Sequence, residues 1–217
     1  MIKDNVEKVR GQIAAVCARI KVDPAKITLV CVTKGRSIDQ IQVAIDAGLT
    51  NLGENKVQEA QEKYSQLANV KWHMIGHLQS NKARDAVKIF DLIHSVDSVS
   101  LAQEIDKQAA KINKIQSVLL EVKTSPEATK FGFAPQVLAD AYAEIAKLKN
   151  VRVQGLMTLA PLVSDAKEAA PYFATLRQLR DKINPSWLLS MGMSDDFSVA
   201  LTEGAEMIRL GRAIFKE

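Results

Sequence analysis

Short apolar segments alternate with longer segments of helical periodicity along the whole sequence, and this alternation most limits the possible fold. The first segment, residues 27–32, is a mostly apolar, β-branched run that fits a strand buried on both faces of a parallel sheet. Strands that alternate with helices form parallel βα units. The predicted strands are residues 27–32, 51–53, 72–75, 92–94, 118–122, 152–156, 187–189 and 207–210.

Between these segments apolar residues recur every three or four positions, which is the spacing of one helix face. A further stripe precedes the first strand and predicts an extra N-terminal helix of about five turns, and Gly48 is placed to end the helix after that strand. Examples of these stripes are Ile2/Val6/Val9/Ile13/Val16/Ile20, Ile38/Ile41/Ile45, Val57/Ala60/Tyr64/Leu67, Ala102/Ile105/Ala109/Ile112, Leu138/Ala141/Ile145/Leu148 and Phe173/Leu176/Leu179/Ile183.

Eight such units favour a closed barrel, because an open doubly wound sheet of this length more often has roughly five or six strands. No linker, low-complexity tract or short repeat interrupts the 217 residues. We therefore predict an α/β fold, a single (β/α)8 TIM barrel, with residues 1–217 forming one domain.

Charge and cysteine usage exclude several classes of function. The 29 Lys and Arg exceed the 25 Asp and Glu by a small surplus spread along the chain, and no basic block is interleaved with aromatic residues, so nucleic acid is not expected as a partner. Cys17 and Cys31 have no second ligand at metal-binding spacing, so no metal is expected. The charged start and the lack of a long apolar stretch predict a cytoplasmic protein without a membrane span.

Functional groups of such a barrel gather at the carboxyl ends of its strands. Lys34 stands there, directly after the first strand and before Gly35. An amine held at the rim of an apolar barrel loses solvation, and this favours the free base that attacks an aldehyde. The alternative is a solvated lysine at the end of a strand.

The segment after the seventh strand suits a phosphate. It reads as a strand end, a turn containing Gly192, and Ser194 as the N-cap of the next helix, whose free N–H groups favour an anion. Asp195 and Asp196 would repel a phosphate and are expected to point away from it.

The eighth strand adds Arg209 and Gly211 near its end. The glycine permits close backbone approach, and the arginine is a cation for a phosphate or for a ring nitrogen. A buried closing strand with a paired arginine is the alternative. Because the first and eighth strands of a closed barrel are neighbours, the lysine and these groups together predict a phosphorylated aldehyde as ligand.

At these residues the sequence resembles the pyridoxal phosphate homeostasis proteins (the YggS/PROSC family), which share the barrel of the alanine racemase N-terminal domain, known as fold type III of pyridoxal phosphate proteins. The resemblance spans nearly the whole chain. It rests on residues 32–34, 53–59, 72–82, 130–132, 155–158, 189–197 and 208–211.

The resemblance implies a cofactor, pyridoxal 5′-phosphate (PLP), and specific binding residues. Lys34 is expected to hold PLP as an internal aldimine, and Asn55 to lie near the ring. Ser190, Ser194, Arg209 and Gly211 are expected around the phosphate, with the pyridine nitrogen as the other possible contact of Arg209.

Two further positions bear on that site. Lys130 matches a family lysine that bears on cofactor exchange, or else it is a solvated loop charge. Arg212 stands where the family has a small hydroxyl residue, and it either removes a phosphate hydrogen bond or replaces it with a charged one.

The resemblance further implies a protein that buffers or delivers PLP in vitamin B6 homeostasis and has no dedicated catalytic reaction. Racemisation needs acid/base groups on both faces of the cofactor, and related racemases obtain one from a C-terminal β domain that is not expected here. A racemase-like PLP enzyme and a cofactor-free Schiff-base aldolase stay open as alternatives. The expected partners are PLP itself and, transiently, PLP-dependent apo-enzymes, with the protein acting as a monomer.

The histidines are interpreted as structural. His73 and His94 lie in or at the end of predicted strands and are expected to be satisfied core or rim residues, and His77 is expected at the rim. Ser80 or Asn81 is expected to cap the helix that follows them.

Overall fold

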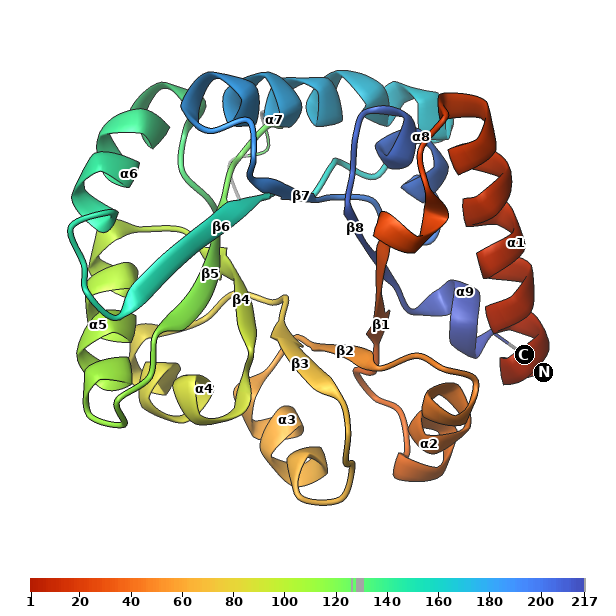
Figure 1. Ribbon diagram of the computed structural model, residues 1–217, viewed down its shortest axis with the longest axis horizontal. Helices are drawn as coiled ribbons and strands as arrows, with labels where there is room; N and C mark the ends of the chain where they lie inside the picture. The colour runs from red at the N-terminus through yellow and green to blue at the C-terminus, as the bar shows by residue number, and fades with distance from the viewer. Residues whose placement is uncertain (126, 128–130, 217) are drawn as a thin grey trace.

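The eight predicted strands close into one parallel barrel in the computed structural model, which describes residues 1–125, 127 and 131–216 (Figure 1). Each strand pairs with the next, and β1 pairs with β8, with Val30 opposite Arg209. The TIM barrel expected from the alternation is therefore confirmed. The strands are β1 (Thr28–Val32), β2 (Asn51–Glu54), β3 (Lys71–Met74), β4 (Leu92–Val96), β5 (Gln116–Glu121), β6 (Val151–Met157), β7 (Leu188–Ser190) and β8 (Met207–Leu210).

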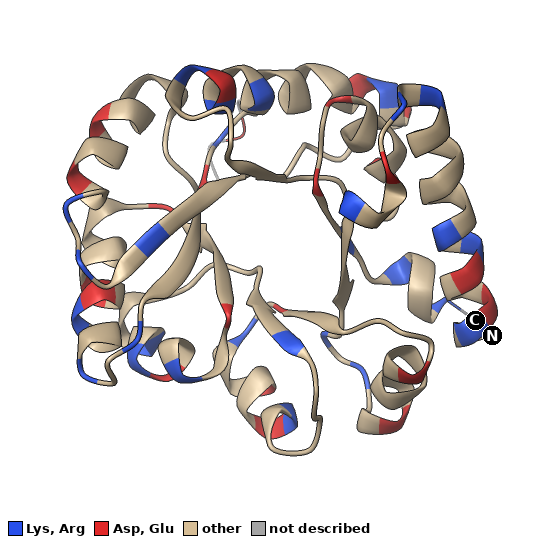
Figure 2. Cartoon of the chain, viewed as in Figure 1, with Lys and Arg blue, Asp and Glu red and all other residues tan. Residues whose placement is uncertain are grey.

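Helices surround the barrel, and acidic and basic residues are interspersed along them (Figure 2). Among the described residues no helix has the length and apolar character that spanning a bilayer requires. The helices are α1 (Ile2–Ile20), α2 (Ile38–Asp46), α3 (Val57–Tyr64), α4 (Ala83–Ile89), α5 (Val99–Ala110), α6 (Leu138–Ile145), α7 (Ala170–Ile183), α8 (Phe197–Thr202) and α9 (Arg212–Phe215). Short 3-10 turns are η1 (Pro24–Lys26), η2 (Ser80–Lys82), η3 (Pro135–Val137) and η4 (Ala166–Ala169).

The predicted N-terminal helix forms as α1 and packs beside α9, so that the two ends of the chain lie together (Figure 1). Val6, Val9, Ile13 and Val16 of its apolar stripe are buried. The amide of Asn5 donates hydrogen bonds to the carbonyls of Ile214 and Lys216 at 3.0 and 2.9 Å. These contacts fix the short last helix, which follows the strand that carries Arg209.

Two expected helix starts are wrong. Ser194 does not cap α8, because Asp196 accepts the Met193 N–H and the helix begins only after Asp196. Neither Ser80 nor Asn81 caps α4, because the chain first makes the 3-10 turn η2 and Lys82 then occupies the N-cap position without a side-chain bond. In both places a preceding turn delays the start of the helix beyond the residue with the favourable cap chemistry.

Candidate functional site

Lys34 lies in a turn just beyond β1, at the carboxyl-end mouth of the barrel. The Arg36 N–H donates to the Thr33 carbonyl at 3.1 Å, and Gly35 has φ +66°. These are features of a type II turn, in which the third position favours glycine. Lys34 is exposed, so the expected loss of solvation is wrong: the turn carries the residue past the apolar strand and into solvent.

A pocket of about 360 Å³ adjoins this turn and joins the ends of β1, β7 and β8. Ser194 accepts a hydrogen bond from the Ala213 N–H at 3.2 Å, and its own hydroxyl proton stays available for an acceptor. Three cationic side chains make the pocket suitable for an anion. Its lining residues are Arg36, Ser194, Asp195, Arg212, Ala213 and Lys216.

The two aspartates after Ser194 behave differently from each other. Asp196 is buried and accepts the Met193 N–H at 2.6 Å, so its carboxylate is turned back to its own loop, as expected. Asp195 is one of the residues that line the pocket. It forms an ion pair with Arg212, which balances its charge and bridges the loops after β7 and β8.

Gly211 lies where β8 meets the end of β1. A β-carbon on Gly211 would lie 3.3 Å from Cβ of Val32 and 3.4 Å from its carbonyl oxygen. The glycine therefore lets the start of α9 sit close to the strand that leads to Lys34. The first N–H groups of a helix have no partner within it, so this end of α9 adds donors beside the pocket.

Arg209 lies inside the barrel and is only 3% exposed. Its Nη1 donates to the Ser190 hydroxyl at 2.6 Å, and its Nη2 donates to the Thr158 carbonyl at 2.8 Å. Burial lowers the pKa of Arg209 to about 10, against the opposing effect of the nearby Asp196 and Glu121 carboxylates. The guanidinium is thus a charged group in a fixed orientation.

A chain of hydrogen bonds continues from Ser190 across the barrel interior. His94 Nδ1 lies 2.9 Å from the Ser190 hydroxyl, His94 Nε2 lies 2.9 Å from His73 Nδ1, and His73 Nε2 lies 3.1 Å from Asn51 Oδ1. An amide oxygen only accepts, so His73 Nε2 carries a proton and its Nδ1 accepts from His94. His94 Nδ1 then accepts from the Ser190 hydroxyl, which in turn accepts from Arg209.

Both histidines are neutral in this arrangement. Burial lowers the pKa of His73 to about 4, and burial, reinforced by the neighbouring His73 and Arg209, lowers the pKa of His94 well below its usual value. The interpretation of both as satisfied buried residues is confirmed. Through His94 the pair contacts the Ser190 hydroxyl, which in turn contacts Arg209.

Replacing Glu121 by glutamine is expected to change how stability depends on pH. Burial, with the nearby Asp97, raises the pKa of Glu121 from 4.5 to about 7. The folded protein therefore holds this proton more tightly than the unfolded chain. The stability that results is fully present below pH 4.5 and is lost as the pH rises through about 7. The loss is about 3 kcal/mol, from about 1.4 kcal/mol per pKa unit.

Urea unfolding of the wild type and Glu121→Gln at about pH 4.5 and about pH 8 measures this loss. The difference in free energy of unfolding, variant minus wild type, should increase by about 3 kcal/mol from about pH 4.5 to about pH 8, because only the wild type loses this stability. Glu144→Gln, on an exposed position of α6, is the matched control and should show no such rise. A pH-independent difference for Glu121→Gln would contradict the assignment.

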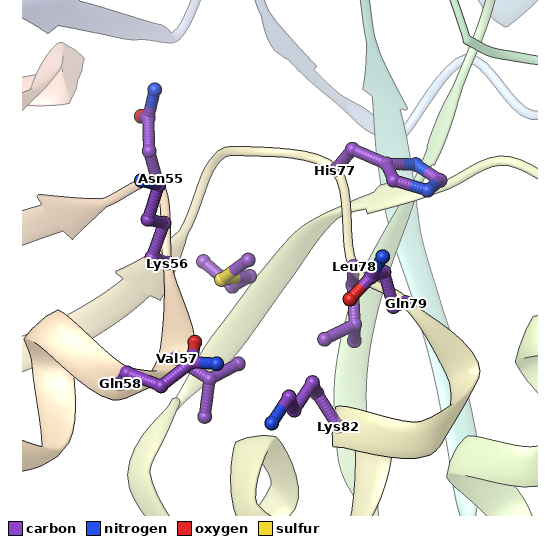
Figure 3. Close-up of a pocket in the computed structure, with 9 residues that line it drawn as sticks. Asn55, Lys56, Val57, Gln58, His77, Leu78, Gln79 and Lys82 are labelled. Carbon is purple, nitrogen blue, oxygen red and sulfur yellow. The ribbon is translucent and has the colours of Figure 1, made fainter.

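On the other side of Lys34 a second pocket, of about 580 Å³, opens at the ends of β2 and β3. Figure 3 shows Asn55, Lys56 and Gln58 on one side of it, and His77, Gln79 and Lys82 on the other. Gly76 permits the close approach of the two loops, because a β-carbon there would lie 2.4 Å from the Asn55 carbonyl oxygen. Asn55 is thereby held at the mouth.

His77 links three loops around this mouth. Its Nδ1 lies 3.0 Å from Asp97 Oδ2, and its ring stacks on Phe131 with the centroids 3.6 Å apart. The expected rim position is confirmed. Its partners follow β4 and β5, and no local pattern in the sequence indicates them.

Lys34, Asn55, Ser194 and Gly211 thus lie around one mouth, and Ser190 and Arg209 lie in the interior beneath it. Lys130 lies outside the described residues. Among the described residues no cluster of three or more His, Cys, Asp and Glu side chains could hold a metal ion.

Comparison with known proteins adds a family relation. All 217 residues match the family model for the alanine racemase N-terminal domain. A relative from Synechocystis named pyridoxal phosphate homeostasis protein is 40% identical over 88% of this chain and 92% of its own length. A relative of the same name from Aquifex aeolicus is 38% identical over 99% of this chain and 97% of its own. PipY from Synechococcus elongatus, solved with PLP bound, has a TM-score of 0.86 and 36% identity, covering 99% of this chain and 100% of that one.

Proposed function

Because the chain belongs to the alanine racemase N-terminal domain family, and within it to the pyridoxal phosphate homeostasis proteins, we propose that it binds PLP and serves vitamin B6 homeostasis. One observation carries the proposal: the turn that bears Lys34 contributes Arg36 to the cationic pocket that Ser194 and Arg212 line. A reactive amine and an anion-binding pocket are thus adjacent. PLP supplies an aldehyde for the amine and a phosphate dianion for the pocket.

The residues present fit this cofactor. We propose that Lys34 captures the aldehyde and that Asn55 lies beside the ring. The phosphate is held by the Ser194 hydroxyl, the N–H groups at Gly211 and Arg212, and the positive charge of Arg212. Arg212 thus replaces a family hydroxyl by a cation, and its pairing with Asp195 keeps that cation near the pocket.

For Arg209 we favour the ring over the phosphate. Arg209 is not among the residues that line the cationic pocket, and its guanidinium is held in the interior by Ser190 and Thr158. The Ser190 hydroxyl donates its one proton to His94 and accepts from Arg209, so it has no proton left for a phosphate, and we assign Ser190 to orienting Arg209. This revises the expectation that Ser190 contacts the phosphate.

We further propose that the protein holds and releases PLP without a dedicated reaction. Carbanion chemistry on PLP requires an enclosed site from which water is excluded, whereas Lys34 is exposed. An open mouth also suits direct transfer to apo-enzymes from a monomer. Incubation of the loaded protein with each L-amino acid in D₂O tests this, because rapid exchange at Cα with loss of stereochemistry would identify a racemase-like enzyme.

Borohydride mapping tests PLP binding itself. The purified protein loaded with PLP should be yellow, and reduction should bleach it and leave a pyridoxyl group on the peptide that contains Lys34. Protein that stays colourless on addition of PLP, and that borohydride instead links to a sugar phosphate through Lys34, would favour a cofactor-free Schiff-base aldolase. A pyridoxyl group on another peptide would refute the assignment of Lys34.

A further inference from the structure

A cluster of three charged residues, two of them buried and the third partly exposed, lies next to the turn that carries Lys34, and the proposed function does not use it. Lys63 of α3 is only 6% exposed, and Glu54 at the end of β2 is 0% exposed. The Lys63 ammonium lies 2.7 Å from Glu54 Oε1 and 2.9 Å from Glu59 Oε1. Its third hydrogen bond, at 2.8 Å, goes to the Thr33 carbonyl. All three ammonium protons are therefore used.

This cluster holds the peptide groups on both sides of Lys34. The Thr33 carbonyl belongs to the peptide that precedes Lys34 and accepts from Lys63. The Gly35 N–H belongs to the peptide that follows Lys34 and donates to Glu59. The Thr33 hydroxyl donates to Glu54 at 2.6 Å, and its N–H donates to the Gly53 carbonyl at 2.9 Å. The backbone at Lys34 is thus fixed from both ends, while its side chain stays exposed.

Burial of Glu54 in this cluster is unfavourable for its charge. Burial raises the pKa of Glu54 despite the hydrogen bonds from Lys63 and Thr33, and its Oε2 has no hydrogen-bond partner among the described residues. Burial also tends to raise the pKa of Glu59, but the bonds from the Gly35 N–H and Lys63 outweigh it and the net shift is downward. A buried ion pair often stabilises a protein no more than apolar side chains of the same volume do. The feature that apolar side chains would not reproduce is the anchoring of the Thr33 carbonyl and the Gly35 N–H.

We propose that Lys63, Glu54 and Glu59 are positioning residues that orient Lys34 for capture of the PLP aldehyde. The inference rests on the proposed function and adds a role to residues outside the ligand pocket. In the step concerned the neutral Lys34 amine attacks the aldehyde carbon, a C=N bond replaces the C=O bond, and the aldehyde oxygen leaves as water with the two amine hydrogens. A turn free to move would present the amine in many orientations, and a misplacement of about 1 Å can slow a reaction about 100-fold.

The test compares Lys63→Met and Glu59→Ala with the wild type in two measurements. The first is the rate at which PLP becomes fixed to Lys34 by borohydride after mixing. The second is the affinity for pyridoxine 5′-phosphate, which has the phosphate and ring but an alcohol in place of the aldehyde. Glu62→Ala is the matched control, because it makes the same change at the neighbouring exposed position of α3.

We expect capture to be about 10-fold slower in Glu59→Ala and up to about 100-fold slower in Lys63→Met, with the affinity for pyridoxine 5′-phosphate unchanged. Glu62→Ala should match the wild type in both measurements. Glu59 lies at the partly exposed edge of the cluster, so its replacement disturbs folding less than that of Lys63. If Lys63→Met does not fold, the capture rate of Glu59→Ala tests the inference by itself.

Two results on the capture rate would overturn the inference: an unchanged rate in a folded variant, or an equal slowing in Glu62→Ala. A parallel loss of affinity for pyridoxine 5′-phosphate would also overturn it, because that would indicate general damage to the site. If the wild type itself does not fix PLP at Lys34, the proposed function has failed instead, and the two failures are thereby distinguished.

Discussion

Replacement of Lys34 by alanine is expected to abolish the pyridoxyl adduct and the yellow colour while leaving weak binding of PLP. The covalent bond depends on one amine at the end of β1. The cationic pocket around Ser194 and Arg212 does not depend on that amine, so its contacts with the phosphate remain. Reduction with borohydride and mass spectrometry of the peptides measure the adduct, and equilibrium dialysis measures the remaining affinity.

Lys26→Ala is the matched control for this variant. Lys26 is an exposed lysine just before β1, at the opposite end of the strand from Lys34. Its replacement removes the same charge and should leave the adduct at the wild-type level. An adduct that persists in Lys34→Ala would show that another lysine captures the aldehyde. A complete loss of binding would show that the late loops do not hold the phosphate.

Replacement of Gly155 by alanine is expected to lower the free energy of unfolding by about 3 kcal/mol. A β-carbon at this position of β6 would lie 2.0 Å from the Leu188 carbonyl oxygen and 2.8 Å from its carbonyl carbon and nitrogen. These are backbone atoms of β7, the shortest strand, so they can move only if the pairing of β6 with β7 is disturbed. Urea unfolding followed by circular dichroism measures the change.

Gly11→Ala makes the same substitution where space is free. Gly11 is exposed within α1, and a β-carbon there would have no neighbour within 4 Å. Alanine in the middle of a helix is more stable than glycine by roughly 0.5–1 kcal/mol, so this variant should gain stability. Equal effects of the two substitutions would show that close packing at Gly155 does not hold β6 against β7.

Lys34 and Gly155 both belong to segments on which the family resemblance rests, but they contribute in different ways. The segment that contains Lys34 presents a reactive group at the mouth. The segment that contains Gly155 allows two strands to approach within the barrel wall, and the Thr158 carbonyl at its end holds Arg209. The segments that carry the resemblance therefore include one that builds the barrel wall.

The expectations that failed concern solvation and local turns. Lys34 follows an apolar strand, which predicted a desolvated amine, but the turn from Thr33 to Arg36 places it in solvent. Ser194 has the chemistry of an N-cap residue. The N-cap position of α8 is instead occupied by Asp196, whose carboxylate closes the preceding turn by accepting the Met193 N–H. In each case one hydrogen bond between near neighbours decided the outcome.

The sequence by itself determined the succession of the eight strands, because an apolar run is a local property that each of the eight segments carries independently. Parallel strands joined by right-handed crossovers then make β1 and β8 neighbours, and this brings the loop of Lys34 to the loops of Ser194 and Gly211. The adjacency of these three loops could therefore be predicted from the sequence alone.

Only the tertiary structure decided how the interior and the anchoring contacts are arranged. The bond between His94 and Ser190 joins residues 96 positions apart, and that between Arg209 and Thr158 joins residues 51 positions apart. Lys63 reaches the Thr33 carbonyl across 30 positions. Such contacts depend on which side chains meet after the barrel closes, and a pattern of apolar residues carries no information about which polar groups will face one another.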